Sequence, residues 1–310
     1  MARAAPILAF EGEVVELERK ATELERLSAG DVDFSREAAR LRQKASALLR
    51  KGLAKLDGWQ ALQLAAHPSR PGPGDLLVHL LDKKAAVGAV RGDATEAGTK
   101  SALGELAERP VVLLAYDVGA NLHSPSSAQV QLESLRCALR AVALAAQLGR
   151  PLVILINVLE QGSGEQVAGE LGRLGLALAD FEPPSVVVVT GQATGALAHV
   201  LMIADEVLMM RYAVLGGFSL AEVKAELYDH GTGLDTVAQT MIMTATTAQE
   251  SGFVDGVVDE VEGGAQRDPG QACEILACAV NEALQRASAI GERLAQRATR
   301  AKLARGYKER

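Results

Sequence analysis

The sequence predicts an α/β protein in which short, buried strands alternate with helices. The chain has 310 residues, 48% of them hydrophobic, which is enough for a sizeable core. Between two apolar runs, residues 131–148 form a long Ala/Leu-rich segment with helical spacing, and Gly149 suits a left-handed helix cap. Strands buried on both faces give continuous apolar runs, so we expect a largely parallel sheet covered by helices. The runs of strand length are residues 85–90, 111–116, 152–157, 186–190 and 206–210.

The first segment with a clear pattern is an amphipathic helical hairpin. From Val14, apolar residues fall at positions 14, 17, 21 and 24, on one face of a helix. A turn signal at residues 28–31 separates this helix from a second one over residues 35–56. The inward residues of the second helix are Leu41, Ala45, Leu48 and Leu53. We interpret the hairpin as a packing or dimerisation arm and not as a catalytic element.

Proline and glycine mark a boundary between this arm and the main domain. We predict an N-terminal helical extension over residues 1–74 and a main domain over residues 75–310. From about Leu220 onward the pattern predicts helices. The tail, residues 292–310, contains seven Lys or Arg and two Glu, which is typical of a solvated or subunit-facing surface; contact with coenzyme phosphates is the alternative. The boundary residues are Pro68, Pro71, Gly72, Pro73 and Gly74.

Charge and cysteine usage exclude several classes of function. A net charge of −7 argues against general binding to nucleic acid, which needs a basic face. The three cysteines form no CxxC pair, so we predict neither a metal site nor a disulfide framework. Glu11 and Glu13 interrupt the start before an apolar segment of sufficient length, and no later run reaches about 18 apolar residues. We therefore expect a cytoplasmic protein that does not enter a membrane.

The segment from Val186 to Asp205 is the main candidate for chemistry. We expect a strand that ends near Thr190, a glycine-bearing turn, and a helix that begins near Gly195. The backbone N–H groups of Gly195 and Ala196 then lack intrahelical acceptors and are candidate catalytic donors to an oxyanion. A plain packing connection is the competing interpretation. The spacing of Gly191, Ala193, Gly195 and Asp205 resembles the G-x-A-x-G and following D at the second oxyanion donor of crotonase-superfamily proteins.

Motifs along nearly the whole chain resemble one family. The specific elements are Trp-Gln, Gln-Leu and His-Pro-x-Arg-Pro, which occur in that order within residues 57–71. Further matches are the opening residues 8–18, Leu41-Arg-Gln-Lys, Asp82-Lys-Lys-Ala-Ala-Val-Gly, Gly263-Gly-Ala-Gln-Arg-Asp-Pro and Lys302-Leu-Ala-Arg-Gly-Tyr-Lys. Together they resemble the carboxyltransferase subunit alpha family of bacterial acetyl-CoA carboxylase, within the crotonase/ClpP-like superfamily.

The resemblance implies a crotonase-like spiral of β-β-α units and a biotin-dependent carboxyl transfer in fatty acid or polyketide biosynthesis. The carboxyl group would come from carboxybiotin on a biotin carboxyl carrier protein, and not from biotin attached to this chain. It would pass to an acyl-CoA shared with a beta-type, zinc-ribbon partner in a hetero-oligomer. Besides the Gly195 and Ala196 donors, the predicted binding residues are Gly162, Gly164, Gly191, Gln192 and His123.

The centre of the chain departs from the family pattern. Residues 156–166 are shorter than the family's D-T-P-G-A-Y-P-G region and lack its Pro and Tyr, and residues 191–198 contain fewer glycines than G-E-G-G-S-G-G-A-L-A. A basic run is missing before Asn121, and Gly216-Gly-Phe-Ser replaces S-P-E-G. Two alternatives therefore stay open: a noncatalytic assembly subunit, and a crotonase-like enzyme that acts on acyl-CoA or acyl-carrier-protein thioesters without biotin.

Two further expectations concern side chains and assembly. We interpret His199, within the helix after Gly195, as a satisfied core or interface residue, and the Asp229, His230 and Asp235 group as a turn between helices. The two apolar stripes of the hairpin predict that another surface covers them. Together with the beta-type partner that the resemblance implies, they predict an obligate oligomer of heteromeric type.

Overall fold

The protein is described by a computed structural model that covers residues 8–28, 33–82, 84–89, 98–118, 128–159, 165–217, 224, 233–295 and 297–298. In this part of the chain nine strands form one sheet, in the order β1-β2-β3-β4-β5-β6-β9, with β7 paired to β5 and β8 paired to β7. From β3 through β4, β5 and β6 to β9, each strand runs parallel to the next. At the other edge, β1 pairs antiparallel with β2, and β2 pairs antiparallel with β3. The α/β prediction is therefore confirmed, with an antiparallel edge. The strands are β1 (Lys84–Ala89), β2 (Lys100–Leu106), β3 (Arg109–Val118), β4 (Leu152–Val158), β5 (Ser185–Thr194), β6 (Glu206–Met210), β7 (Val214–Gly216), β8 (Ile242–Thr244) and β9 (Gly256–Val258).

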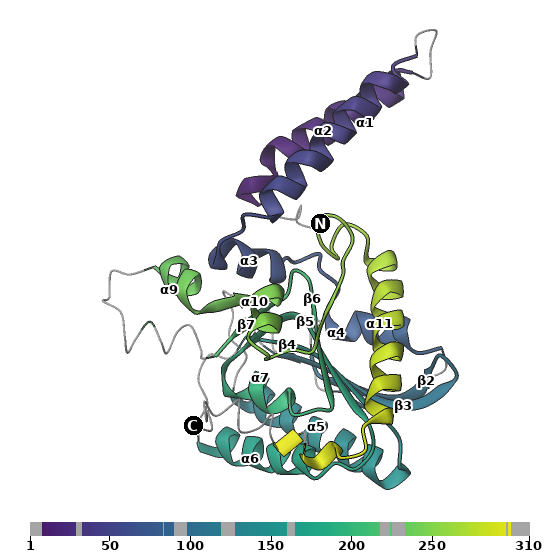
Figure 1. The fold of residues 1–310 in the computed structure, drawn as a ribbon, viewed down its shortest axis with the longest axis vertical. Helices are drawn as coiled ribbons and strands as arrows, with labels where there is room; N and C mark the ends of the chain where they lie inside the picture. The colour runs from purple at the N-terminus through teal and green to yellow at the C-terminus, as the bar shows by residue number, and fades with distance from the viewer. Residues whose placement is uncertain are drawn as a thin grey trace.

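Helices enclose the central strands (Figure 1). α5 and α6 pack together against the sheet, while α4 and α11 form a second packed pair on β3 to β6. Every residue of β3 from Val111 onward is buried, so both faces of this strand are covered. The helices are the 3-10 turn η1 (Ala9–Glu11), α1 (Gly12–Leu27), α2 (Ser35–Leu53), α3 (Gly58–Ala65), α4 (Pro73–Leu80), α5 (Ala128–Leu148), α6 (Glu165–Ala179), α7 (Gly195–Leu201), α9 (Leu234–Met241), α10 (Ala245–Glu250) and α11 (Pro269–Ala289).

The α1–α2 hairpin projects from the body as a long arm (Figure 1). The two stripes pack against each other, but Leu41, Leu48 and Leu53 are only partly buried, so the prediction that another surface covers them stays a prediction. Val14 and Leu17 of α1 pack against Ala45 and Leu49 of α2. Among the described hairpin residues, Leu27 is the one large apolar side chain that is exposed. The small buried residues Ala21, Ala38 and Ala45 let the helices approach closely enough to bury their seam.

Three features of the secondary structure differ from the expectations. Helix α2 ends at Leu53, three residues before the predicted end. Strand β2 and the short strands β7, β8 and β9 were not predicted, and two of them lie in the C-terminal region that was expected to be helical. The cap after α5 is confirmed, since Gly149 has φ +59°. Of the helices that the structure describes, none combines the length and the apolar character that a bilayer span requires.

Candidate active site

The candidate site is built on a bend in β5. Up to Val189, β5 lies between β4 and β6; from Gln192 onward it pairs with β7 instead of β6. On the β4 side the register passes from Ile156–Val189 to Val158–Ala193, so residues 190–192 of β5 face the single residue Asn157. The predicted turn after Thr190 is therefore wrong: the strand continues to Thr194 through an irregularity that sets three residues opposite one, and its neighbouring strand changes.

At the bend, side chains form hydrogen bonds with backbone groups of β5 that do not pair with a neighbouring strand. The Thr190 carbonyl accepts a hydrogen bond from Arg70 Nε at 2.8 Å. The N–H of Gln192 donates to Asn157 Oδ1 at 2.9 Å, and Thr190 Oγ1 donates to the Ile156 carbonyl at 3.1 Å. An unpaired buried peptide group is costly, so Arg70 and Asn157 make this bend possible in the core.

Gly191 and Gln192 are enclosed at the bend. A Cβ on Gly191 would lie 2.7 Å from Asn157 Oδ1 and 3.2 Å from the Ala65 carbonyl oxygen, so no larger residue fits without a shift. Gln192 is fully buried. These contacts explain both residues through packing, and their predicted part in ligand binding stays a prediction.

A buried carboxylate lies beside Asn157. Asp117, at the end of β3, is the register partner of Asn157 on β4, and its Oδ1 accepts from Asn157 Nδ2 at 3.1 Å. Burial raises the pKa of Asp117 to about 7, with a smaller upward contribution from Asp75, while the Asn157 hydrogen bond and Lys100 lower it. Sequence reasoning missed Asp117. The available signal was that polar residues close the apolar strands β3 and β4 at neighbouring ends.

The predicted oxyanion donors lie where β5 enters α7. Helix α7 begins at Gly195 as expected; Gly195 has φ +80° and is buried, whereas Ala196 is exposed. Thr194 precedes them in an extended conformation with φ −126° and makes no side-chain cap. The N–H groups of a first helical turn have no intrahelical acceptor, so they are able to donate to a negatively charged oxygen. His199 Nδ1 lies 2.8 Å from the Gly195 carbonyl oxygen, which agrees with a satisfied histidine.

The remaining predicted site residues fall outside the described part of the chain. His123 lies in the segment 119–127 after β3, and Gly162 and Gly164 lie in the segment 160–164 after β4. Asp229 and His230 are also outside it. The structure therefore brings together Gly191, Gln192, Gly195 and Ala196 along one strand–helix connection, and the functional roles of all seven residues stay predictions.

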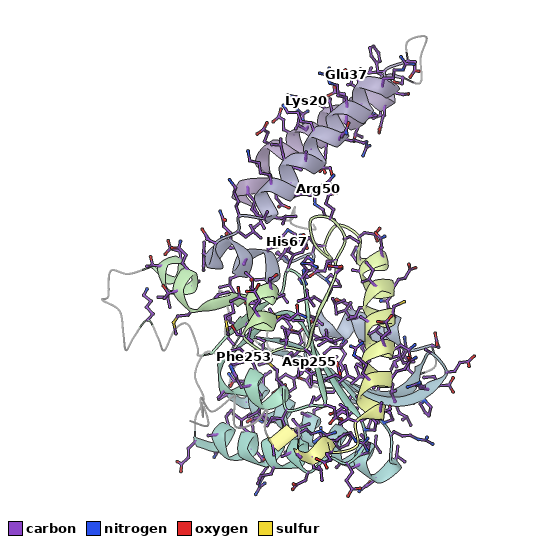
Figure 2. The ribbon with its side chains drawn as sticks, in the orientation of Figure 1. Lys20, Glu37, Arg50, His67, Phe253 and Asp255 are labelled. Atoms are coloured by element: carbon purple, nitrogen blue, oxygen red, sulfur yellow. The ribbon has the colours of Figure 1, made fainter. Side chains whose placement is uncertain are left out.

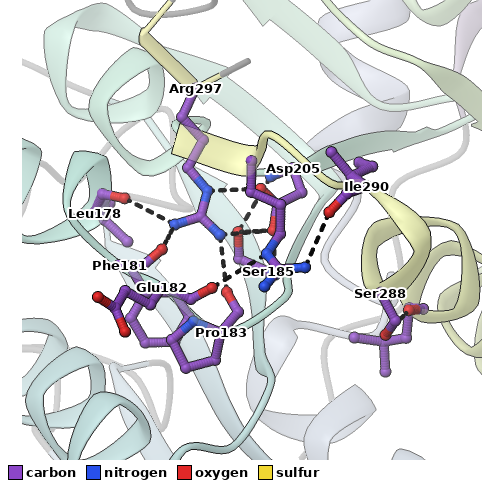
Figure 3. A network of polar contacts seen from close by, with 11 residues as sticks. Leu178, Phe181, Glu182, Pro183, Ser185, Asp205, Ser288, Ile290 and Arg297 are labelled. Atoms are coloured by element: carbon purple, nitrogen blue, oxygen red, sulfur yellow. Dashed lines mark hydrogen bonds and ion pairs between the residues drawn. The ribbon is translucent and has the colours of Figure 1, made fainter. Parts of the chain in front are cut away.

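Asp205, the last residue of the glycine pattern, is part of a buried ion pair (Figure 3). Arg297 donates to both of its carboxylate oxygens, from Nε at 2.7 Å and from Nη2 at 2.6 Å, and both side chains have 0% exposure. Asp205 also accepts from the N–H of Ser185 at 2.8 Å, which fixes the start of β5. Arg297 donates further to the carbonyls of Phe181 and Pro183. This part of the basic tail is thus neither solvated nor available to phosphate.

A second buried ion pair explains the His-Pro-x-Arg-Pro element. Arg70 donates to Glu260 through Nη1 at 2.8 Å and Nη2 at 2.7 Å, in addition to its bond to Thr190. Glu260 in turn accepts from the N–H groups of Tyr212 and Ala265. Figure 2 shows the neighbouring His67 at the base of the arm. Arg70 therefore connects the N-terminal region, the β5 bend and the segment after β9.

The described residues contain no group of three or more His, Cys, Asp or Glu side chains arranged to hold a metal ion. What the described site offers to a ligand is a pair of backbone N–H groups at the start of α7 and a rigid, buried support beneath them. Such a site can stabilise negative charge on an oxygen atom without a side chain that reacts.

Comparisons with known proteins identify a family for nearly the whole chain. The family model described as acetyl co-enzyme A carboxylase carboxyltransferase-like matches residues 7–305. The acetyl-coenzyme A carboxylase carboxyl transferase subunit alpha of Erythrobacter litoralis (strain HTCC2594) is 31% identical over 290 residues, which cover 89% of this chain and 91% of the relative. The subunit of the same name from Rhizorhabdus wittichii is 31% identical over 292 residues, or 90% of this chain and 92% of the relative.

Solved structures show more distant likenesses. The transcarboxylase 12S with methylmalonyl-coenzyme A and methylmalonic acid bound gives a TM-score of 0.48 at 16% identity, over 75% of this chain and 46% of that longer chain. A Pseudomonas malonate decarboxylase hetero-dimer gives a TM-score of 0.43 at 19% identity, over 64% of this chain and 84% of that one.

Proposed function

Because the chain belongs to the acetyl-CoA carboxylase carboxyltransferase-like family, we propose that it is the alpha-type carboxyltransferase subunit of a biotin-dependent acyl-CoA carboxylase. In this role it transfers a carboxyl group from carboxybiotin to an acyl-CoA. The observation that carries the proposal is the relationship along the whole chain, which includes the β5–α7 connection with its buried Gly195 at φ +80°. The mixed α/β sheet fits the crotonase-like fold expected of such a subunit.

This subunit contributes to the reaction by stabilising negative charge on an oxygen atom of the bound group. Carboxybiotin, when bound, supplies the carboxyl group. The N–H groups of Gly195 and Ala196 would hold its ureido oxygen and stabilise negative charge on that atom. As further binding residues of this site we propose His123, Gly162, Gly164, Gly191 and Gln192. A preorganised donor of this kind contributes about 10²- to 10³-fold in rate.

The partners follow from the same proposal. A beta-type carboxyltransferase subunit binds the acyl-CoA together with this chain, and a separate biotin carboxyl carrier protein delivers the carboxylated biotin. The enzyme is a cytoplasmic hetero-oligomer of fatty acid or polyketide biosynthesis. The relatives named above as alpha subunits support this assembly.

The decisive experiment removes one backbone donor. Ala196→Pro deletes the N–H of the second residue of α7, a position in the first helical turn where proline is tolerated. We expect the purified complex with its beta-type partner to carboxylate free biotin from malonyl-CoA, and Ala196→Pro to lower kcat by about 10²- to 10³-fold.

Matched controls separate the lost donor from the strain of the new ring. Thr246→Pro places proline at the second residue of the short helix α10, on another part of the surface, and Ala196→Ser keeps the donor while it changes the side chain. Both controls are expected to retain activity. A complex that assembles fully but shows no turnover with any acyl-CoA would rule out the carboxyltransferase assignment.

The second candidate is a noncatalytic assembly subunit. The enclosed bend favours it, because Gly191 is packed against Asn157 and Ala65 and Gln192 is fully buried. Residues 156–166 also depart from the family pattern. In that case Ala196→Pro leaves cellular function intact. An enzyme that acts on acyl-CoA or acyl-carrier-protein thioesters without biotin would lose activity in Ala196→Pro but work without the carrier protein.

A further inference from the structure

A chain of two hydrogen bonds supports the β5 bend from below. Asp117 Oδ1 accepts from Asn157 Nδ2 at 3.1 Å, and Asn157 Oδ1 accepts from the N–H of Gln192 at 2.9 Å. Gln192 lies three residues before Gly195 on the same strand. These two hydrogen bonds therefore join a buried carboxyl group to the strand segment that ends at the candidate oxyanion donors.

The direction of these two hydrogen bonds is fixed by the backbone N–H of Gln192. The Gln192 N–H is a donor only, so the Asn157 amide turns its oxygen toward Gln192 and its NH₂ group toward Asp117. Asp117 must then accept. An ionised carboxylate accepts through both oxygens, and a charge-assisted bond is about twice as strong as a neutral one, so ionised Asp117 is the matched state.

We propose that Asp117 and Asn157 are positioning residues that hold the β5 bend and thereby aim the N–H groups of Gly195 and Ala196 at the reacting oxygen. The role rests on the carboxyl transfer proposed above. Ionised Asp117 orients Asn157, Asn157 fixes Gln192, and the strand leads without a turn into α7. Because β5 is buried and closely packed along its whole length, the backbone position at Gln192 also determines the position of the start of α7.

The groups around Asp117 make its hydrogen bond to Asn157 depend on pH. Two charged groups face it, Asp75 from α4 and Lys100 from β2. Burial, the largest effect, and Asp75 raise its pKa, Lys100 and the Asn157 hydrogen bond lower it, and the result is about 7. Gly72 packs beside the other carboxylate oxygen, since a Cβ at this residue would be 3.1 Å from Asp117 Oδ2. The carboxyl group therefore changes charge across the neutral range, and the donors are best aligned above it.

The first experiment follows the backbone directly and needs no substrate. Amide ¹H–¹⁵N shifts of Gln192 and Gly195 are recorded in the full chain across neutral pH. In the wild type we expect both to titrate with one midpoint near the Asp117 pKa of about 7. The titration is expected to disappear in Asp117→Asn and to move to higher pH in Lys100→Gln, which removes the cation. Asp180→Asn, at an exposed position, is the matched control and should leave it unchanged.

The second experiment measures carboxyl transfer by the complex with its beta-type partner. The wild-type kcat is expected to fall as the pH is lowered, with that same midpoint. In Asp117→Asn this fall in kcat at low pH is expected to disappear. Asn157→Ala should lower kcat by about 10- to 100-fold, with KM for the acyl-CoA changed by less than about threefold, because the donors are misplaced but the thioester site is not.

The outcomes separate the two proposals. Amide shifts of Gly195 that ignore pH, or that titrate equally in Asp117→Asn, overturn the positioning role. So does a wild-type pH profile that persists in an active Asp117→Asn complex. Shifts that titrate as expected in a wild-type complex without any turnover overturn the proposed carboxyl transfer and leave the backbone support established.

Discussion

Replacing Asp117 with asparagine should stabilise the protein at alkaline pH and much less at acidic pH. The folded protein holds the proton of this carboxyl up to a pKa of about 7, whereas an ordinary aspartate, as in the unfolded chain, has a pKa of 3.8. The unfolded state therefore gains stability by ionising between about pH 4 and pH 7, where the folded state does not, so wild-type stability falls as the pH rises through this window and levels off above it. Asparagine carries no such proton.

The magnitude follows from the pKa difference. One pKa unit corresponds to about 1.4 kcal/mol, so moving from pH 5 to pH 8 costs the wild type about 3 kcal/mol through this group. Asp117 is 7% exposed, so solvent screening removes little of this effect. Asp117→Asn keeps the size of the side chain and an acceptor for Asn157 Nδ2, and its stability relative to the wild type should rise by that amount over the same interval.

Urea unfolding of both chains at several pH values measures the effect, with Asp180→Asn as an exposed control whose curve should parallel the wild type. The comparison uses free energies of unfolding at each pH. Curves for the wild type and Asp117→Asn that stay parallel from pH 5 to pH 8 would refute the elevated pKa and, with it, the proton sensitivity of the bend.

Three further predictions concern stability and are checked by the same unfolding measurements. Arg297→Met should cost about 3–5 kcal/mol, because it leaves the fully buried Asp205 without its partner; a loss below about 1 kcal/mol would contradict this. Arg50→Met should change stability by less than about 1 kcal/mol, since its pair with a glutamate is exposed. Gly191→Ala should destabilise by about 1–3 kcal/mol through overpacking, whereas Gly169→Ala, in the open interior of α6, should be neutral or stabilising.

Periodicity predicted the arm, the long α5 and the central strands because each of them contains enough apolar residues at a regular spacing. It did not predict β2, Lys100–Leu106, whose alternation is interrupted by Gly104 and begins with two polar residues. The three-residue strands β7, β8 and β9 are shorter than any period that a sequence can display. Pairing with neighbours, and not local composition, makes these segments extended.

The candidate site was predictable at its helix start but not beneath it. The glycine pattern placed α7 at Gly195 correctly, since a positive φ at a helix start favours glycine. The same glycine signal at Gly191 suggested a turn, whereas the residue serves a close approach of Asn157 in a continuing strand. Asp117 escaped notice because its partner Asn157 lies 40 residues away, and only the parallel register of β3 and β4 brings them together.

The ion pair between Arg297 and Asp205 has a consequence for how the protein is made. Asp205 lies at the junction that starts β6 and anchors Ser185 of β5, yet its counter-charge is 92 residues further along the chain. During synthesis the sheet can pair while this carboxylate still lacks its guanidinium, so the core reaches full stability only after Arg297 has emerged. Products that stop before residue 297 retain a buried, uncompensated charge, and cellular proteases can distinguish them from the finished chain by their higher unfolded fraction.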